Sequence, residues 1–288
     1  MIKIGYECFG IGSGAFEQIL FAGIRFLIAG VLVFSVSAIK EKRIPRIAEG
    51  NGKNVFCVAV FYTFLQYIFF YIGLSGTSGA SGSIVNSVSV FIAVLLSHFV
   101  YPDDKLTVRK AAGVALGFAG VLFATLAGGN MCVFSFSGEG LILVAAMCFA
   151  IGSMLNKRAT KRNDGFTVTA YNLMIGGAML ILLGLLGGGG GFTVTPKGVL
   201  VLFYLCAVSA IGFSILSVLL RKYPVGRVSV YNFVIPVSGT ILSALILGED
   251  ILRWQYPVAL LAVCAGILLV NRCGNASAAA RRCPDETV

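Results

Sequence analysis

The residues best suited to chemistry in this chain are polar side chains inside long apolar stretches. Arg25 is the only formal charge well inside such a stretch, away from its ends. Stretches of this length are typical of membrane-spanning helices, in which a charge is costly unless it is paired. Arg25 is therefore expected to pair with an anionic solute group, or to gate together with a carboxylate. Snorkelling to the headgroups, or a structural pair with Glu17, stays open as the alternative.

Amide and phenol side chains near the centres of apolar stretches are further candidates for solute binding. They would hydrogen-bond and stack against a small amphipathic molecule. An interhelical hydrogen bond is the alternative for the asparagines. Tyr71 lies near the end of a stretch, where an interfacial tyrosine is equally typical. The candidate substrate-binding residues are Gln66, Tyr67, Asn86, Asn172, Tyr231 and Asn232.

Pro236 follows Asn232 by one helical turn. Proline has no amide hydrogen, so it frees the carbonyl of Asn232 and kinks the helix. The kink predicts either a hinge or a static bend inside the membrane-spanning helix. Arg25 and Pro236 are therefore the candidate gating or hinge residues.

His98 and Asp103 match the H-x4-D spacing of glycerolipid acyltransferases, in which histidine acts as a base oriented by aspartate. His98 ends an apolar stretch, however, and Ala244 holds the equivalent position in the repeat described below, so a chance match is favoured. No metal-ligand spacing, nucleophile motif or nucleotide motif is found. We therefore predict no catalytic residue, no metal and no cofactor.

The composition explains where these residues must lie. Hydrophobic residues form 58% of the 288 residues and charged residues 12%, against about a quarter charged in soluble domains. The mean hydropathy is +0.93. Nine windows long enough to cross a bilayer predict an all-α integral membrane protein. They are 18–39, 54–74, 79–100, 110–127, 138–156, 167–187, 198–220, 227–248 and 255–271.

Basic residues give the chain a formal charge of +10, but they gather in alternate loops, such as 40–53 and 157–162. This alternation is typical of the cytoplasmic loops of a membrane protein rather than of a nucleic-acid surface. We expect a multi-pass protein of the cell (cytoplasmic) membrane with its C-terminus in the cytoplasm.

The two halves of the chain resemble each other at an offset of 146 positions. This register pairs Asn86 with Asn232 and Asp103 with Glu249. The loop charges place Asp103 inside and Glu249 outside, so the halves have opposite orientation. Inverted repeats of this kind build a transporter site near the bilayer midplane.

Inversion requires an odd number of spans in each repeat, yet the first has four and the second five. Phe16 aligned with Phe166 places Met1 inside the helix that opens the second repeat. We expect the first helix of the pattern to be absent, through a miscalled start or a truncation. The expected domains are an incomplete first repeat at 1–128, a second repeat at 138–271 and a cytoplasmic tail at 272–288.

The chain resembles the drug/metabolite transporter superfamily, and specifically its EamA-type members, which have two five-helix repeats. The resemblance rests on FAGIRFLIAG (21–30), on the stretch 71–104, and on KYPVGRVSVYNFVIPVSGTILSALILGEDI (222–251) with the helix after it. Val90 stands where the family often has a proline, and Asp103 where glutamate is commoner. The resemblance implies ten helices, a central cavity and transport of small metabolites or drugs.

These observations predict a secondary transporter that moves a small metabolite, amino acid or drug-like molecule by alternating access. Its partners would be this solute and the bilayer, and the pattern also allows a homodimer. Import and export both stay open, as does the driving gradient. The alternatives are the acyltransferase based on His98 and Asp103, and an inactive or partner-completed transporter fragment.

Overall fold

The structure is a computed structural model, and every regular element in its described part is helical. It divides into two compact units that each combine segments from both halves of the chain. The described residues are 2–12, 14–42, 44–77, 79–101, 106–126, 136–223, 225, 228, 234, 237–239, 241–242 and 255–280.

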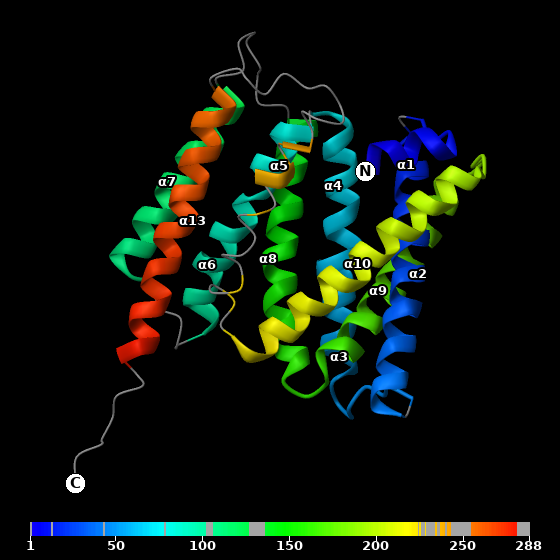
Figure 1. Cartoon of the computed structure of the whole chain (residues 1–288), viewed down its shortest axis with the longest axis horizontal. Helices are drawn as coiled ribbons and strands as arrows, with labels where there is room; N and C mark the ends of the chain where they lie inside the picture. Colours follow the sequence, from blue (N-terminus) through cyan, green and yellow to red (C-terminus); the bar gives the residue numbers. More distant parts are fainter. Residues whose placement is uncertain are drawn as a thin grey trace. The chain divides into compact units, whose positions relative to one another are not determined.

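Unit 1 comprises residues 1–75 and 151–223, and unit 2 comprises residues 76–150 and 224–288. Helix α8 (Leu141–Thr160) contributes its first half to unit 2 and its second half to unit 1. The other helices of unit 1 are α1 (Ile2–Phe9), α2 (Ala15–Glu41), α3 (Gly52–Val58), α4 (Gln66–Ser75), α9 (Gly165–Leu186) and α10 (Pro196–Lys222), with a π-helical segment η1 (Ala59–Leu65) between α3 and α4. Those of unit 2 are α5 (Gly79–Asn86), α6 (Val88–Val100), α7 (Val108–Leu126), η2 (Phe136–Gly140) and α13 (Gln255–Ala280) (Figure 1).

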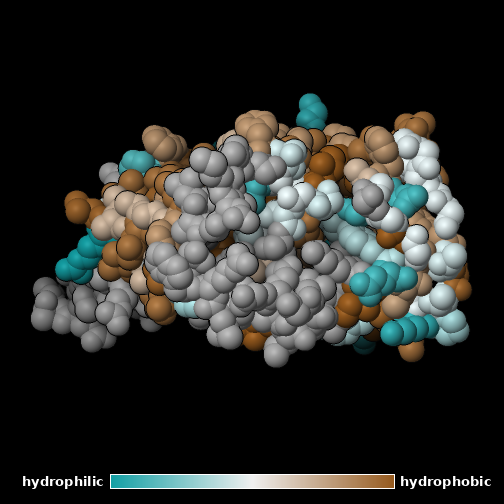
Figure 2. Space-filling model, turned by 90° about the horizontal axis from the view of Figure 1, so that it is seen from above, coloured by the Kyte–Doolittle hydropathy of each residue, from teal (hydrophilic) through white to brown (hydrophobic). Residues whose placement is uncertain are grey.

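The described helices agree with the predicted apolar windows. Six of them, or unbroken runs of them, are long and apolar enough to cross a membrane, and Pro257–Val270 adds a shorter apolar helix. Helix α7 occupies the window 110–127, whereas the window 227–248 lies largely outside the described residues. Hydrophobic side chains cover much of the visible described surface (Figure 2), as expected for a protein that faces lipid.

Two helices of unit 1, α9 and α10, begin directly after residues whose side chains cap the first turn. The Asp164 side chain accepts a hydrogen bond from the Phe166 backbone at 3.2 Å and caps α9. Thr195 accepts one from the Gly198 backbone at 3.0 Å, and Pro196 follows it in the first turn of α10. Both arrangements satisfy amide groups that the first turn of a helix leaves without partners.

Helices α2 and α9 pack closely and run antiparallel in unit 1. A Cβ atom placed on Gly23 would lie 2.7 Å from the Ile181 nitrogen, and one on Gly30 would lie 2.7 Å from the Met174 nitrogen. Residue numbers rise along one helix as they fall along the other, which defines the antiparallel direction. Only glycine allows backbones to approach this closely.

Helices α7 and α13 repeat this arrangement in unit 2, where they lie side by side (Figure 1). A Cβ atom on Gly113 would lie 3.0 Å from the Val270 nitrogen, and one on Gly120 would lie 3.1 Å from the Ala259 carbonyl oxygen. These two helices are therefore antiparallel as well.

Each antiparallel pair consists of helices that the sequence repeat makes equivalent. The register of Phe16 with Phe166 relates α2 to α9, and the offset of 146 relates α7 to α13. Equivalent helices that pair in opposite directions are what two repeats of inverted topology produce. The all-helical membrane architecture is confirmed, and both pairs are consistent with the inversion.

Candidate functional site

Arg25 on α2 is buried inside unit 1, with 4% of its surface exposed. Its guanidinium carbon lies 4.4 Å from the ring centroid of Phe26 and 5.9 Å from that of Tyr67. These distances are typical of cation–π contacts. Such contacts stabilise a desolvated arginine but do not neutralise its charge.

The two structural alternatives for Arg25 do not match the structure. The burial of the side chain leaves no room for snorkelling to the headgroups. Glu17 instead accepts a hydrogen bond from the Gly12 backbone at 3.1 Å. Within the described ranges, no carboxylate lies within ion-pair distance of Arg25, and its Nε atom has no hydrogen-bond partner.

Three tyrosines surround the guanidinium: Tyr6 from α1, and Tyr67 and Tyr71 from α4. The ring centroids of Tyr67 and Tyr71 are 5.8 Å apart, and those of Tyr6 and Tyr71 are 6.3 Å apart. Tyr67 is the tyrosine that contacts the guanidinium, and its ring leads to that of Tyr71 and then to that of Tyr6. The hydroxyls of Tyr6 and Tyr71 are buried without a hydrogen-bond partner in the described structure.

Tyr71 is 1% exposed, so it is not an interfacial tyrosine. Sequence reasoning selected Tyr67 and left Tyr71 open, but it missed Tyr6 altogether because Tyr6 lies in a short helix outside every apolar window. The only available signal was an aromatic residue twelve positions before the first predicted span, which begins at residue 18.

The π-helical segment η1 leads into the part of α4 that carries Gln66, Tyr67 and Tyr71. Two glycines make room for it, because a Cβ on Gly152 of α8 would lie 2.7 Å from the Tyr62 Cα atom, and one on Gly176 of α9 would lie 2.6 Å from the Thr63 Cβ atom. Such segments break the regular helical register, and they are frequent at functional sites.

Gln66, the first residue of α4, is 6% exposed, and its Oε1 atom has no hydrogen-bond partner among the described residues. Asn172 on α9 is buried too, but its Oδ1 atom accepts a hydrogen bond from the Thr63 hydroxyl at 3.0 Å. Gln66 therefore has a free acceptor atom for a solute, whereas Asn172 links α9 to η1. Both residues lie in unit 1 with Arg25.

A second polar group in unit 1 was not selected from the sequence. Asn156 of α8 donates to the Ser217 hydroxyl at 2.9 Å, and the Thr169 hydroxyl donates to the same Ser217 oxygen at 2.7 Å. Ser214 on α10 is buried, and its hydroxyl lacks a partner in the described structure. Small hydroxyl residues are ordinary in apolar helices, so they gave no signal.

The remaining predicted site residues are not brought to this cluster by the structure. Asn86 ends α5 in unit 2 and is only partly buried. Tyr231, Asn232 and Pro236 lie outside the described residues, so their predicted roles stay predictions.

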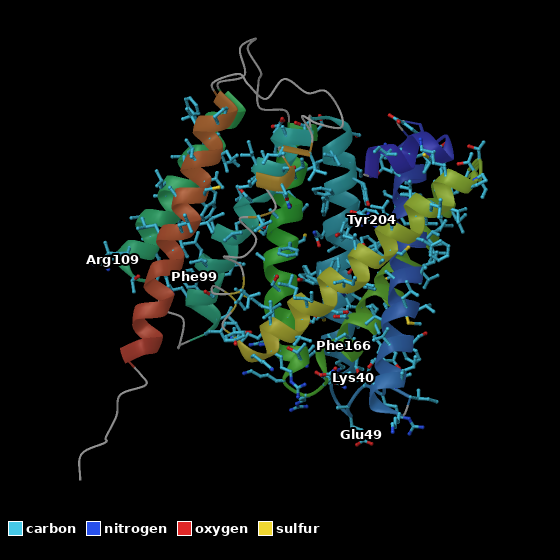
Figure 3. The ribbon with its side chains drawn as sticks, in the orientation of Figure 1. Lys40, Glu49, Phe99, Arg109, Phe166 and Tyr204 are labelled. Atoms are coloured by element: carbon cyan, nitrogen blue, oxygen red, sulfur yellow. The ribbon has the colours of Figure 1, made fainter. Side chains whose placement is uncertain are left out.

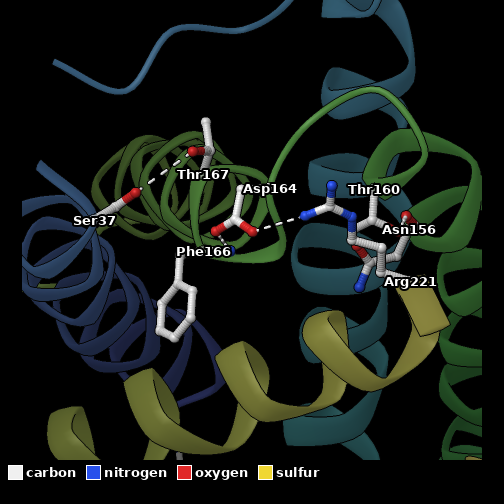
Figure 4. A network of polar contacts seen from close by, with 7 residues as sticks. All are labelled: Ser37, Asn156, Thr160, Asp164, Phe166, Thr167 and Arg221. Atoms are coloured by element: carbon white, nitrogen blue, oxygen red, sulfur yellow. Dashed lines mark hydrogen bonds and ion pairs between the residues drawn. The ribbon is translucent and has the colours of Figure 1, made fainter. Parts of the chain in front are cut away.

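Several polar contacts tie together one end of unit 1. The Asn51 amide nitrogen donates to Asn163 at 2.7 Å and to the Ala159 carbonyl at 2.9 Å. Arg221 forms an ion pair with Asp164 at 2.9 Å (Figure 4).

The Lys40 ammonium lies 4.5 Å from the ring centroid of Phe166 at this same end (Figure 3). The loops that follow α2 and α8 and the basic last turn of α10 thus meet here. This grouping agrees with the charge pattern that predicts their common side of the membrane.

His98 has a structural hydrogen bond rather than a catalytic arrangement. Its Nδ1 atom accepts a hydrogen bond from the Leu106 backbone at 3.0 Å. Asp103 lies outside the described residues. In the described part of the chain, no three His, Cys, Asp or Glu side chains lie close enough together to hold a metal ion.

Long apolar helices, with an antiparallel pair of equivalent helices in each unit and a buried polar cluster within unit 1, define a multi-pass membrane protein of the solute-transporter class. The EamA-like transporter family matches the chain twice, at residues 8–126 and 136–272. The chain belongs to this family, and the two matches confirm its two-repeat organisation. It is a transporter and not an enzyme.

Similar proteins support the same class. "Uncharacterized transporter YvbV" of Bacillus subtilis is 29% identical over 91% of this chain and 85% of its own. "Probable amino-acid metabolite efflux pump" of Salmonella typhimurium is 27% identical over 90% and 87%. "S-adenosylmethionine/S-adenosylhomocysteine transporter" of Chlamydia trachomatis is 27% identical over 84% and 78%. A solved structure that is 18% identical has the same fold, with a TM-score of 0.73 over 98% of this chain and 93% of the other.

Proposed function

We propose that the protein is a secondary transporter of the cell membrane. It moves a small metabolite, amino acid or drug-like molecule by alternating access from the two sides of the membrane. Its C-terminus lies in the cytoplasm. The family match gives the class, and the names of the relatives from Salmonella typhimurium and Chlamydia trachomatis favour amino acids and their metabolites.

The observation that carries this proposal is the set of buried polar atoms without partners in unit 1. Leaving a polar group unpaired in an apolar interior costs about 1–3 kcal/mol. Several such groups in one unit are explained if a solute supplies their missing partners during transport. They include the hydroxyls of Tyr6, Tyr71 and Ser214, the Nε of Arg25, the Oε1 of Gln66 and the Oδ1 of Asn156.

The orientation follows from the basic loops. The end of unit 1 that holds Lys40, Arg221 and the loop before Asn51 would face the cytoplasm, where positively charged loops are retained. The polar contacts at this end would then close the cytoplasmic side of unit 1. A homodimer is compatible with this arrangement, and nucleic acid has no part in it.

Uptake of radiolabelled amino acids and their metabolites into proteoliposomes tests the proposal. We expect at least one compound to enter faster than it enters protein-free liposomes, and to accelerate the exit of preloaded compound. A pH gradient would change the rate if protons drive transport. Equal rates with and without protein for the whole panel would contradict the proposed function.

A further inference from the structure

We propose that Arg25 and the hydroxyls of Tyr6 and Tyr71 form a subsite for the carboxylate group of the transported molecule. This inference rests on the proposed function and narrows it to one class of solute, a small carboxylate with an apolar or aromatic body. Arg25 and Tyr71 would contact the solute directly, so they are binding residues rather than gate residues.

The first argument is the charge of the unit 1 interior. Arg25 keeps its charge under physiological conditions, and it is 4% exposed in an apolar bundle. Its described neighbours are neutral: the rings of Phe26 and Tyr67 lie against it, and the Cys206 thiol donates to its backbone carbonyl at 3.3 Å. A buried ion without a counter-ion is strongly unfavourable, so an anion that binds here is stabilised.

The second argument is the number of hydrogen-bond donors around this charge. The Nε atom of Arg25 and the hydroxyls of Tyr6 and Tyr71 are buried and lack partners within the described residues. The rings of these two tyrosines belong to the cluster that contacts the guanidinium through Tyr67. A carboxylate accepts several hydrogen bonds and suits the guanidinium geometry. A neutral carbonyl would satisfy the donors but would leave the charge without compensation.

The third argument concerns the rest of the solute. Aromatic rings continue from the charged group along α2, α4 and α10: the ring centroids of Phe26 and Tyr67 are 4.3 Å apart, and those of Phe26 and Phe213 are 6.1 Å apart. Aromatic surfaces of this kind favour apolar or aromatic solute groups. A solute with its carboxylate at Arg25 would place its apolar part against these rings.

Binding to the full chain, purified in detergent, tests the proposal with matched pairs of acids and amides. The probes are phenylalanine with phenylalaninamide and methionine with methioninamide, and Kd is measured by isothermal titration in a low-salt zwitterionic buffer without a carboxylate. We expect the unmodified protein to bind at least one acid about tenfold more tightly than its amide, since a charge-assisted hydrogen bond is worth about that much. Equal affinities for acid and amide in both pairs would overturn the proposal.

Substitutions of Arg25 test whether this residue causes the preference for an acid over its amide. In Arg25→Gln the ratio of amide Kd to acid Kd should fall to about one, and in Arg25→Lys it should keep part of its value, because lysine retains the charge but loses the fork of donors. Arg109 lies on α7 in unit 2 and is exposed, so Arg109→Gln is the matched control and should keep the full ratio. If Arg25→Gln also kept it, the assignment would be wrong.

Two further measurements separate the remaining explanations. Tyr71→Phe removes only a hydroxyl, and it should weaken acid binding several-fold without changing amide binding, even if Arg25→Gln fails to fold. If chloride added at low millimolar concentration abolished acid binding, the site would take an inorganic anion, and the proposal for a carboxylate would be overturned. A third outcome separates the subsite from the function. If the unmodified protein showed no preference for acids, and Arg25→Gln still transported a neutral compound, the subsite would be refuted and the transporter function would stand.

Discussion

Gly177 on α9 offers a quantitative test of the antiparallel pairing of α2 with α9. A Cβ atom at this position would lie 2.6 Å from the Leu27 nitrogen, 3.0 Å from the Gly23 carbonyl oxygen and 3.1 Å from the Leu27 Cα atom. Ordinary contacts between such atoms begin at about 3.5 Å. In Gly177→Ala the two backbones must therefore separate by about 1 Å, or the added methyl group must clash.

The cost follows from this separation. Overpacking of a tight interface costs about 1–3 kcal/mol, and a gap of about 1 Å along the rest of the interface also loses a quarter to a half of each contact's dispersion energy. We expect Gly177→Ala to lose about 2 kcal/mol, which corresponds to a Tm lower by roughly 4–8 °C. Thermal unfolding of the purified chain in detergent, followed by size-exclusion chromatography of the fraction still folded, measures it.

Gly212 on α10 is the matched control, because a Cβ atom there meets nothing within 4 Å. Gly212→Ala should leave Tm unchanged or raise it slightly, since alanine has the higher helix propensity. If Gly177→Ala unfolded at the same temperature as Gly212→Ala, the close approach of α2 to α9 would be refuted.

Three further predictions concern packing and loops. Gly266→Ala should lower Tm by a similar amount in unit 2, because its Cβ atom would lie 2.6 Å from a carbonyl oxygen of α7; an unchanged Tm would refute the pairing of α7 with α13. Asn163→Ala should cost about 1–3 kcal/mol in the same assay, since it leaves the fully buried Asn51 without this partner; a loss below about 0.5 kcal/mol would contradict the buried contact. Asp164→Asn should cost less than about 1 kcal/mol, because its ion pair with Arg221 is partly exposed; a larger loss would show that this pair holds the end of unit 1 closed.

The apolar windows predicted the described spans because hydropathy is a local property of the sequence. Helices α2, α9 and α10 lie where the windows 18–39, 167–187 and 198–220 place them. The π-helical segment between α3 and α4 could not be predicted in this way. It depends on the close approach of Gly152 and Gly176 from two other helices, and no local pattern encodes that.

In the candidate site too, sequence analysis found the residues with a local signal and missed those whose role depends on contacts between distant segments. Arg25 and Gln66 stood out because a charge or an amide in an apolar helix is rare and costly. Tyr6 was missed because its role depends on α1 folding back beside Tyr71. Asn172 was chosen for its polarity, but its carbonyl oxygen is paired with Thr63, and a pairing between distant segments is visible only in three dimensions.

The central claim is that one buried site in unit 1 faces the two sides of the membrane in turn. A single cysteine in place of Gln66, in a chain whose eight native cysteines are replaced, tests it through its reaction with a membrane-impermeant thiol reagent added to either side of oriented vesicles. Gly190→Cys, in the exposed loop after α9, is the control and should react from the outside alone. Alternating access predicts that Gln66→Cys reacts from both sides and that a transported solute slows both reactions. Reaction from one side only, or from neither, would contradict the account.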